Sequence, residues 1–147
     1  MGTQYKDCDM IKAAGAIFLS RKTKRVLLNF RSTSVSKGST FGFWGGKIED
    51  GEEIMQGLSR EIREEVGFIP KHEKIYPLDV YCAPDGVFQY YSFVIIVDKE
   101  FVPRLNSESD GYIWCNLNKF PRQLHVGARL ILENPSYITN ILKMVED

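Results

Sequence analysis

The residues best suited to chemistry are four glutamates that stand close together between two glycines. They are Glu52, Glu61, Glu64 and Glu65, within the segment GKIEDGEEIMQGLSREIREEVGF that runs from Gly46 to Phe68. Three of them follow an i, i+3, i+4 spacing, so a helix would gather them within ~100° of its surface, where like charges repel. Clustered carboxylates suit Mg²⁺ or Mn²⁺, and such an ion would remove this repulsion. The segment therefore predicts a divalent metal site.

A helix is predicted from Glu52 to Val66, because this stretch lacks proline and Gly67 is suited to end it as a C′ glycine. Apolar residues at every fourth position predict a buried stripe of Ile54, Leu58, Ile62 and Val66. Glutamates in a helix ordinarily form a solvated face. Glu65, however, projects onto the edge of the buried stripe, and the helix dipole disfavours anions in the last turn. These two features favour the metal site. Gly57 lies near the carboxylates, and either substrate approach or a tight helix-to-sheet contact explains it.

The composition predicts a single globular domain over residues 1–147. The 19 basic and 19 acidic residues give a formal net charge of zero, so no global positive field attracts extended nucleic acid or a membrane surface. A small molecule is the simpler partner. The longest apolar runs, Ala13–Leu19 and Phe93–Val97, are too short to span a bilayer.

The cysteines and the N-terminus predict a cytoplasmic setting. The three cysteines are an odd number without CxxC spacing, which disfavours a disulfide framework or a zinc site and predicts reduced thiols; they are Cys8, Cys82 and Cys115. The polar, partly acidic stretch Met1–Met10 does not have the composition of a signal peptide.

Short strands and helices are expected to alternate along the chain. Strands are predicted at Lys12–Ser20, Val26–Arg31, Lys74–Tyr81, Val87–Val97 and Tyr112–Asn116. Two further helices are predicted at Val126–Glu133 and Ser136–Val145, and Phe41–Lys47 is expected to lead into the acidic helix. This order predicts an α/β (α+β) fold with a mixed β-sheet between helices.

The segment from Gly46 to Phe68 resembles the Nudix box, G-x5-E-x7-R-E-U-x-E-E-x-G-U with U a bulky apolar residue, and it fills every defined position. The resemblance covers roughly Ile11 to Met144, although only the box is specific. One departure is Trp44, which stands where many members have a proline before the paired glycines. The resemblance implies the Nudix fold, an α/β/α sandwich around a mixed sheet.

The resemblance also implies a metal-dependent hydrolase that cleaves the pyrophosphate linkage of a nucleoside diphosphate joined to another moiety. Water would attack a phosphorus while Mg²⁺ or Mn²⁺ neutralises the developing charge. By position in the box, the metal ligands would be Glu61, Glu64, Glu65 and the backbone carbonyl of Gly46. Arg60 and Glu52 would orient these ligands. The general base stays open among Glu64, Glu65 and Glu108, and a solvated loop position is the other explanation for Glu108.

Residues outside the box would select the substrate. Arg31, at the end of the second strand, could reach a phosphate. Pro84 lies at an offset found in some ADP-ribose-cleaving members, and Tyr81 lies near an offset found in some dinucleoside-polyphosphate members. At most one or two of the aromatics Tyr76, Tyr81, Phe88, Tyr90 and Tyr91 are expected to stack on a base, and most are expected to belong to the faces of the sheet. His72 and His125 are interpreted as structural, because no nucleophile or second histidine lies at telling spacing.

The favoured substrate is accordingly ADP-ribose-like or a dinucleotide. A nucleoside triphosphate of the oxidised-purine type is the alternative within the same chemistry. A non-catalytic Nudix-fold nucleotide-binding module is a third interpretation, which the complete box disfavours. An RNA 5′-end hydrolase would need a basic surface stripe, which the neutral chain does not indicate. Family members are often dimers, so a homodimer is a possible assembly.

Overall fold

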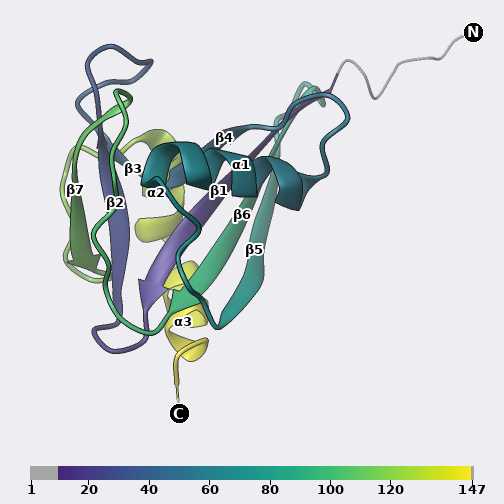
Figure 1. Cartoon of the computed structure of the whole chain (residues 1–147). Helices are drawn as coiled ribbons and strands as arrows, with labels where there is room; N and C mark the ends of the chain where they lie inside the picture. The colour runs from purple at the N-terminus through teal and green to yellow at the C-terminus, as the bar shows by residue number, and fades with distance from the viewer. Residues whose placement is uncertain (1–9, 147) are drawn as a thin grey trace, which may run out of the picture.

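The computed structural model describes residues 10–146, which form a mixed β-sheet with helices on both faces (Figure 1). The strands of this part of the chain are β1 (Ile11–Ser20), β2 (Arg25–Arg31), β3 (Phe41–Gly42), β4 (Trp44–Lys47), β5 (Lys74–Cys82), β6 (Phe88–Val97) and β7 (Ser109–Asn116). The helices are α1 (Ile54–Val66), α2 (Val126–Leu132) and α3 (Pro135–Lys143). The predicted α+β fold is confirmed.

The main path of the sheet runs β3-β2-β1-β6-β5, with β4 paired to β1 and β7 paired to β2. Strands β1 and β6 are parallel, whereas the other strand pairs are antiparallel. The β1–β2 hairpin is paired at Leu19 and Val26. Beyond this pair of residues the two strands have different partners. Strand β2 pairs with β3 and β7, whereas β1 pairs with β4 and β6.

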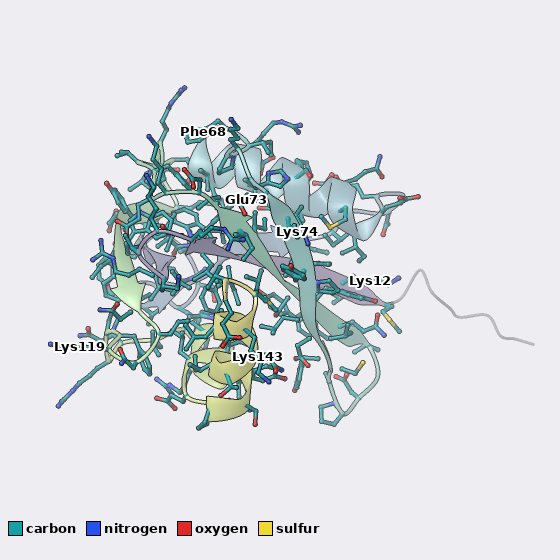
Figure 2. The ribbon with its side chains drawn as sticks, turned by 90° about the horizontal axis from the view of Figure 1, so that it is seen from below. Lys12, Phe68, Glu73, Lys74, Lys119 and Lys143 are labelled. Carbon is teal, nitrogen blue, oxygen red and sulfur yellow. The ribbon has the colours of Figure 1, made fainter. Side chains whose placement is uncertain are left out.

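Alternating side chains of the central strands build a separate core on each face of the sheet. Ile17 and Leu19 of β1 join the cluster that packs against α2 and α3, whereas Ala16 and Phe18 join the cluster under α1. This alternation is the period-two pattern of a strand that is buried on both sides. Figure 2 shows the resulting layers, with Phe68 beyond α1 on one side of the sheet and Lys143 of α3 on the other.

Outside the glycine-rich segment, the observed elements agree with the predicted ones to within three residues at each boundary. Helix α1 begins at Ile54, two residues after the expected start, and β7 begins at Ser109, before the expected Tyr112. The segment Phe41–Lys47 was expected only to lead into the helix, but it contains β3 and β4. Its glycines lower the strand signal, and tertiary pairing with β1 and β2 overrides this low propensity.

Trp44 anchors this glycine-rich segment. Its side chain is fully buried, and its indole Nε1 donates a hydrogen bond to the Leu27 carbonyl at 3.0 Å. The residue that departs from the usual family pattern therefore fills the core beneath β4. Packing of this kind fixes the position of the two glycines that follow.

Two further expectations concern membrane-spanning helices and the cysteines. Within residues 10–146, no helix is long and apolar enough to cross a membrane. Cys82 is exposed and Cys115 is buried, and both are free thiols. Cys8 and almost all of the Met1–Met10 segment lie outside the described residues.

Candidate active site

Helix α1 carries three of the four carboxylates, Glu61, Glu64 and Glu65, and a capping residue defines each of its ends. Glu53 caps its start through a capping box with Gln56, and Gly67 ends it with a φ of 91° while donating to the Arg63 carbonyl. Leu58, Ile62 and Val66 are buried as predicted, whereas Ile54 is partly buried. The buried stripe packs α1 against β1 and β4. This packing turns the carboxylates beside the stripe toward the paired glycines of β4.

Glu65 is the most deeply buried of these carboxylates, with 8% of its surface exposed. Its Oε1 accepts a hydrogen bond from the Gly45 backbone N–H at 3.0 Å. Burial raises the pKa of Glu65 to about 8, and the neighbouring Glu61 and Glu108 carboxylates add to this effect. The Gly45 N–H opposes the rise because it stabilises the ionised form. In the absence of a cation, Glu65 therefore holds a proton near neutral pH.

The paired glycines allow the helix to approach the strand this closely. A Cβ on Gly46 would lie 2.7 Å from the Glu61 carboxyl carbon, so any other residue would displace that side chain. Gly45 has a φ of 139°, and a Cβ there would collide with the Ala14 backbone. The structure thus places the Gly46 backbone directly against Glu61.

Arg60 connects the carboxylates to the segment before the helix. Its guanidinium binds Glu52 through two hydrogen bonds of 2.8 and 3.0 Å, and it donates to Glu61 Oε2 at 3.0 Å. It also donates to the Lys47 carbonyl at 3.0 Å and lies 3.5 Å from Glu64 Oε2. The hydrogen bonds from Arg60 lower the pKa of Glu52. Arg60 and Glu52 therefore form an ion pair through which Arg60 also contacts Glu61 and Glu64.

Glu61 and Glu65 face a cavity of about 290 Å³, which we call the acidic cavity. Its lining residues are Asn29, Arg31, Val35, Gly45, Gly46, Glu61, Glu65, Glu108 and Ser109. Glu108 thus joins the cluster, although its side chain is exposed. Glu64 does not line the cavity, and its side chain is 54% exposed.

Asn106 holds the loop that brings Glu108 into the acidic cavity. Its Nδ2 donates to the Glu64 carbonyl at 2.9 Å, and its Oδ1 accepts from the Glu108 N–H at 2.8 Å. One amide therefore joins the end of α1 to the loop before β7. Nothing in the local sequence indicates this contact, because the two segments are 42 residues apart.

The donors around the acidic cavity suit a hard divalent cation. Carboxylate oxygens, an amide oxygen and the Gly46 backbone are the ligand types that Mg²⁺ and Mn²⁺ prefer. Among the described residues, no group of three or more Asp, Glu, His and Cys side chains converges closely enough to hold an ion as they stand. Arg60 binds Glu61, and Glu64 points outside the cavity, so ion binding would require these two carboxylates to reorient.

A second cavity, of about 620 Å³, lies on the face of the sheet that α2 and α3 cover. We call it the aromatic cavity, since Phe43, Tyr81, Phe88, Tyr90 and Tyr137 contribute to its wall. It shares Arg31, Gly45 and Gly46 with the acidic cavity, so the two cavities meet at these residues. Pro84 is exposed in the turn after β5 and lines neither cavity, whereas Tyr76 and Tyr91 pack against the two cores.

Tyr90 reaches the junction of the cavities because Gly15 has no side chain. A Cβ on Gly15 would collide with the Tyr90 hydroxyl. Burial raises the pKa of Tyr90 to about 12, and the charge of Glu65 contributes. The Tyr90 hydroxyl is therefore a protonated hydrogen-bond donor at neutral pH.

His125 lies at a cavity as well as at a helix cap, and the cavity position was not predicted from the sequence. It caps α2, as a structural residue would, since its Nδ1 accepts a hydrogen bond from the Gly127 N–H at 3.2 Å. It also lines the aromatic cavity. Burial, with the charges of Arg31 and Lys37, lowers the pKa of His125, so the ring is neutral and carries its proton on Nε2.

Gly57 provides close packing rather than an opening for substrate. A Cβ at this position would lie 2.5 Å from Ile48 Cδ1 and 2.9 Å from Glu52 Oε1. Of the two explanations that the sequence left open, the tight contact is correct. The partner is the segment before α1 rather than the sheet.

The sequence of this chain resembles those of known proteins. The chain matches the family model of the NUDIX domain over residues 10–134. The ADP-ribose pyrophosphatase of Methanocaldococcus jannaschii is 41% identical over 64 residues, which cover 44% of this chain and 36% of that protein. The 8-oxo-dGTP diphosphatase of Escherichia coli is 31% identical over 67 residues, which cover 46% of this chain and 52% of that protein. The matches thus span from about a third to about half of the length of these curated relatives.

Solved structures share the fold. A MutT NUDIX hydrolase from Burkholderia pseudomallei superimposes with a TM-score of 0.65 at 24% identity, covering 84% of this chain and 96% of that chain. The Nudix hydrolase RenU from M. smegmatis gives a TM-score of 0.68 at 16% identity, covering 89% of this chain and 85% of that chain. The family match extends from the first strand through α2 and includes the complete acidic segment, and on this basis the chain belongs to the NUDIX domain family.

Proposed function

We propose that this protein is a hydrolase that uses Mg²⁺ or Mn²⁺ to cleave the pyrophosphate linkage of a nucleoside diphosphate joined to another moiety. The observation that supports this proposal is the meeting of two unlike cavities at Arg31, Gly45 and Gly46. One is acidic and suits a cation with a diphosphate, whereas the other is largely apolar and suits a base. A bound divalent ion would supply charge neutralisation and a more acidic water molecule at the diphosphate.

Arg31 is suited to bind a phosphate at this junction. Its Nε and Nη2 donate to the Ser36 carbonyl at 3.1 and 2.5 Å, which holds the guanidinium against the loop after β2. Among the described residues it makes no salt bridge, so its charge is available to an anionic ligand. Guanidinium groups bind phosphate oxygens in a forked geometry.

The aromatic cavity offers both stacking surfaces and directional polar groups. Tyr81 and Phe88 lie at the end of the β5–β6 hairpin, where a base could stack on an aromatic ring. His125 presents Nε2–H as a donor. The Asp79 carboxylate is an acceptor, and hydrogen bonding to it raises the pKa of Tyr137. A purine, which carries both donors and acceptors on its edge, suits this combination.

We assign the role of general base to Glu108. It lines the acidic cavity, and no side-chain hydrogen bond holds its carboxylate within the described part of the chain. Glu65, in contrast, is buried and bound by Gly45, and Glu64 faces outside the cavity. Glu108 is therefore the carboxylate with the freedom to accept a proton from an attacking water molecule.

An ADP-ribose-like or dinucleotide substrate is the first candidate. A relative named ADP-ribose pyrophosphatase has 41% identity in its matched segment. An oxidised-purine nucleoside triphosphate is the second candidate, supported by the relative named 8-oxo-dGTP diphosphatase and by the Asp79 acceptor in the aromatic cavity. Both substrates would place the reacting phosphates beside Arg31.

A hydrolysis assay with Mg²⁺ over ADP-ribose, dinucleoside polyphosphates, nucleotide sugars, 8-oxo-dGTP and dGTP tests the proposal. We expect one class to be cleaved with release of a nucleoside monophosphate. Arg31→Gln should reduce kcat/KM by about 10–100-fold, because it removes a charged hydrogen bond to phosphate. Arg122→Gln, at a site that lines neither cavity, is the matched control. Binding of nucleotides without cleavage of any of them would instead support a non-catalytic module.

A further inference from the structure

Asn29 carries a buried polar atom that the proposed function does not use. It lies in β2, where its backbone is flanked by Gly42 of β3 and Tyr112 of β7, and only 4% of its surface is exposed. Its side chain shares the face of Leu27, two residues earlier, which packs in the core under α1. This face opens into the acidic cavity, whose wall includes Asn29.

The orientation of the Asn29 amide is fixed by one hydrogen bond. Its Nδ2 donates to the Phe43 backbone carbonyl at 3.1 Å. Because a carbonyl accepts but cannot donate, the amide nitrogen must face Phe43 and the oxygen must face away. Asn29 Oδ1 is buried and has no hydrogen-bond partner within residues 10–146. Buried polar atoms are almost always paired, so this oxygen indicates a missing donor.

No neighbour of Asn29 in the cavity donates a hydrogen bond to its Oδ1 within residues 10–146. Glu61 and Glu108 contribute carboxylates, which accept hydrogen bonds when ionised, and Arg31 directs Nε and Nη2 to the Ser36 carbonyl rather than to Asn29. The cavity volume of about 290 Å³ leaves room for several water molecules. Water held by a divalent cation directs its protons outward, toward acceptors such as an amide oxygen.

We propose that Asn29 is a positioning residue of the metal centre, whose Oδ1 accepts a hydrogen bond from a water molecule of the cation's hydration shell. The hydrogen bond from Nδ2 to the carbonyl of Phe43, which lies between β3 and β4, fixes the orientation of this oxygen. The inference rests on the proposed function, since it places the cation in the acidic cavity. It adds a residue of β2, outside the acidic segment, to the groups that set cation affinity.

Titration of the metal-free protein with Mn²⁺, with free Mn²⁺ measured by electron paramagnetic resonance, tests the inference without an activity assay. Asn29→Leu keeps the approximate shape but removes both polar atoms, and Asn29→Asp keeps an acceptor while losing the donor to Phe43. We expect about tenfold weaker Mn²⁺ binding in Asn29→Leu and wild-type or tighter binding in Asn29→Asp. Asn140→Leu, at an exposed position on α3, is the control and should bind as wild type.

A purely structural role for Asn29 predicts a different pattern. If Asn29 acted only through Phe43, the aspartate variant would lose affinity as the leucine variant does, and this result would overturn the inference. Wild-type Mn²⁺ affinity in Asn29→Leu would overturn it equally. If the leucine variant does not fold, the aspartate variant decides alone, and weakened Mn²⁺ binding in that variant overturns the inference. Absence of Mn²⁺ binding by the wild-type protein would instead reject the proposed metal site itself, and the inference with it.

Discussion

At the scale of single residues, Glu65 combines the deepest burial with the largest displacement of pKa among the acidic-segment carboxylates. We predict that Glu65→Gln keeps the fold and lowers kcat by roughly 10²–10⁴, or about 3–5 kcal/mol of transition-state stabilisation, because it removes a charge that would bind the cation. Steady-state kinetics at saturating Mg²⁺ measures this loss. Glu146→Gln, at an exposed position near the C-terminus, is the control and should keep full activity. Wild-type turnover in Glu65→Gln would contradict the assignment.

The pKa of Glu65 also predicts how stability depends on pH in the absence of metal. Since the folded-state pKa of about 8 lies above the ordinary value of 4.5, the folded protein holds this proton more tightly than the unfolded chain. The resulting stabilisation is fully present below pH 4.5 and is lost as pH rises through about 8, by at most about 1.4 kcal/mol per pH unit. Urea unfolding in EDTA across this range should show the decline, and Glu65→Gln should remove most of it. Equal slopes in the two proteins would show that Glu65 is not the titrating group.

Glu108 is expected to affect chemistry more than cation binding. Glu108→Gln should lower kcat by roughly 10²–10⁴ while changing the Kd for Mn²⁺ much less, because its proposed role is to accept a proton. The pH profile should also change, with the acidic limb of kcat/KM flattened in the variant. Glu133→Gln, at an exposed position after α2, serves as the control. An unaltered profile would return the role of base to Glu64 or Glu65.

The sequence predicts these residues unequally well, and the reason is the range of the interactions. The burial of Glu65 follows from its projection beside the apolar stripe, since helical geometry is local. The placement of Glu108 depends on Asn106 bridging segments 42 residues apart. The cavity positions of Asn29 and His125 likewise depend on tertiary packing, for which no local pattern exists.

At the scale of elements, α1 was predicted within two residues because periodicity, a terminal glycine and the absence of proline all agree. Strands β3 and β4 were missed because three of their residues are glycines, whose backbone preference does not favour strands. The same glycines allow α1 to lie close to β4. The absence of a side chain at these glycines therefore weakens the strand signal in the sequence and also allows the close contact between α1 and β4.

Gly57 tests the contact between α1 and the segment before it. In an exposed helix, replacing glycine with alanine stabilises the helix by about 1 kcal/mol. Here Gly57→Ala should instead destabilise the protein by about 1–3 kcal/mol, because its Cβ would lie 2.5 Å from Ile48. It should also weaken activity, since the same Cβ would displace Glu52, the partner of Arg60. Ser59→Ala, in the same helix, is the control in denaturant unfolding. A more stable Gly57→Ala protein would show that Ile48 moves away freely.

At the scale of the whole molecule, the acidic cavity lies on the α1 side of the sheet and the aromatic cavity on the side of α2 and α3. The two cavities meet at Gly45 and Gly46 of β4, which have no side chains to fill the space between them. Strand alternation directs β1 and β6 side chains to both faces, so α1 with its carboxylates packs on one face of the sheet while α2 and α3 pack on the other. The fold class could be predicted from the order of elements. The junction of the cavities could not, because it depends on the parallel pairing of β1 with β6 and on the position of α2.

The electrostatics of the acidic cavity predict a response of the whole domain to divalent ions. An ion that binds the folded but not the unfolded chain raises stability by RT ln(1 + [L]/Kd), about 2.7 kcal/mol at a hundredfold excess over Kd. Combined replacement of Glu64 and Glu65 by glutamine should raise the melting temperature in EDTA, since it removes repulsion and a buried ionisable group, and should abolish the gain from ~10 mM Mg²⁺. Glu64→Gln alone should retain part of the gain, because Glu64 lies outside the acidic cavity before an ion binds. Melting curves of the three proteins in EDTA and in Mg²⁺ measure these differences. Identical shifts in all three would place the ion elsewhere, since a site built on Glu65 cannot respond equally with and without its carboxylate.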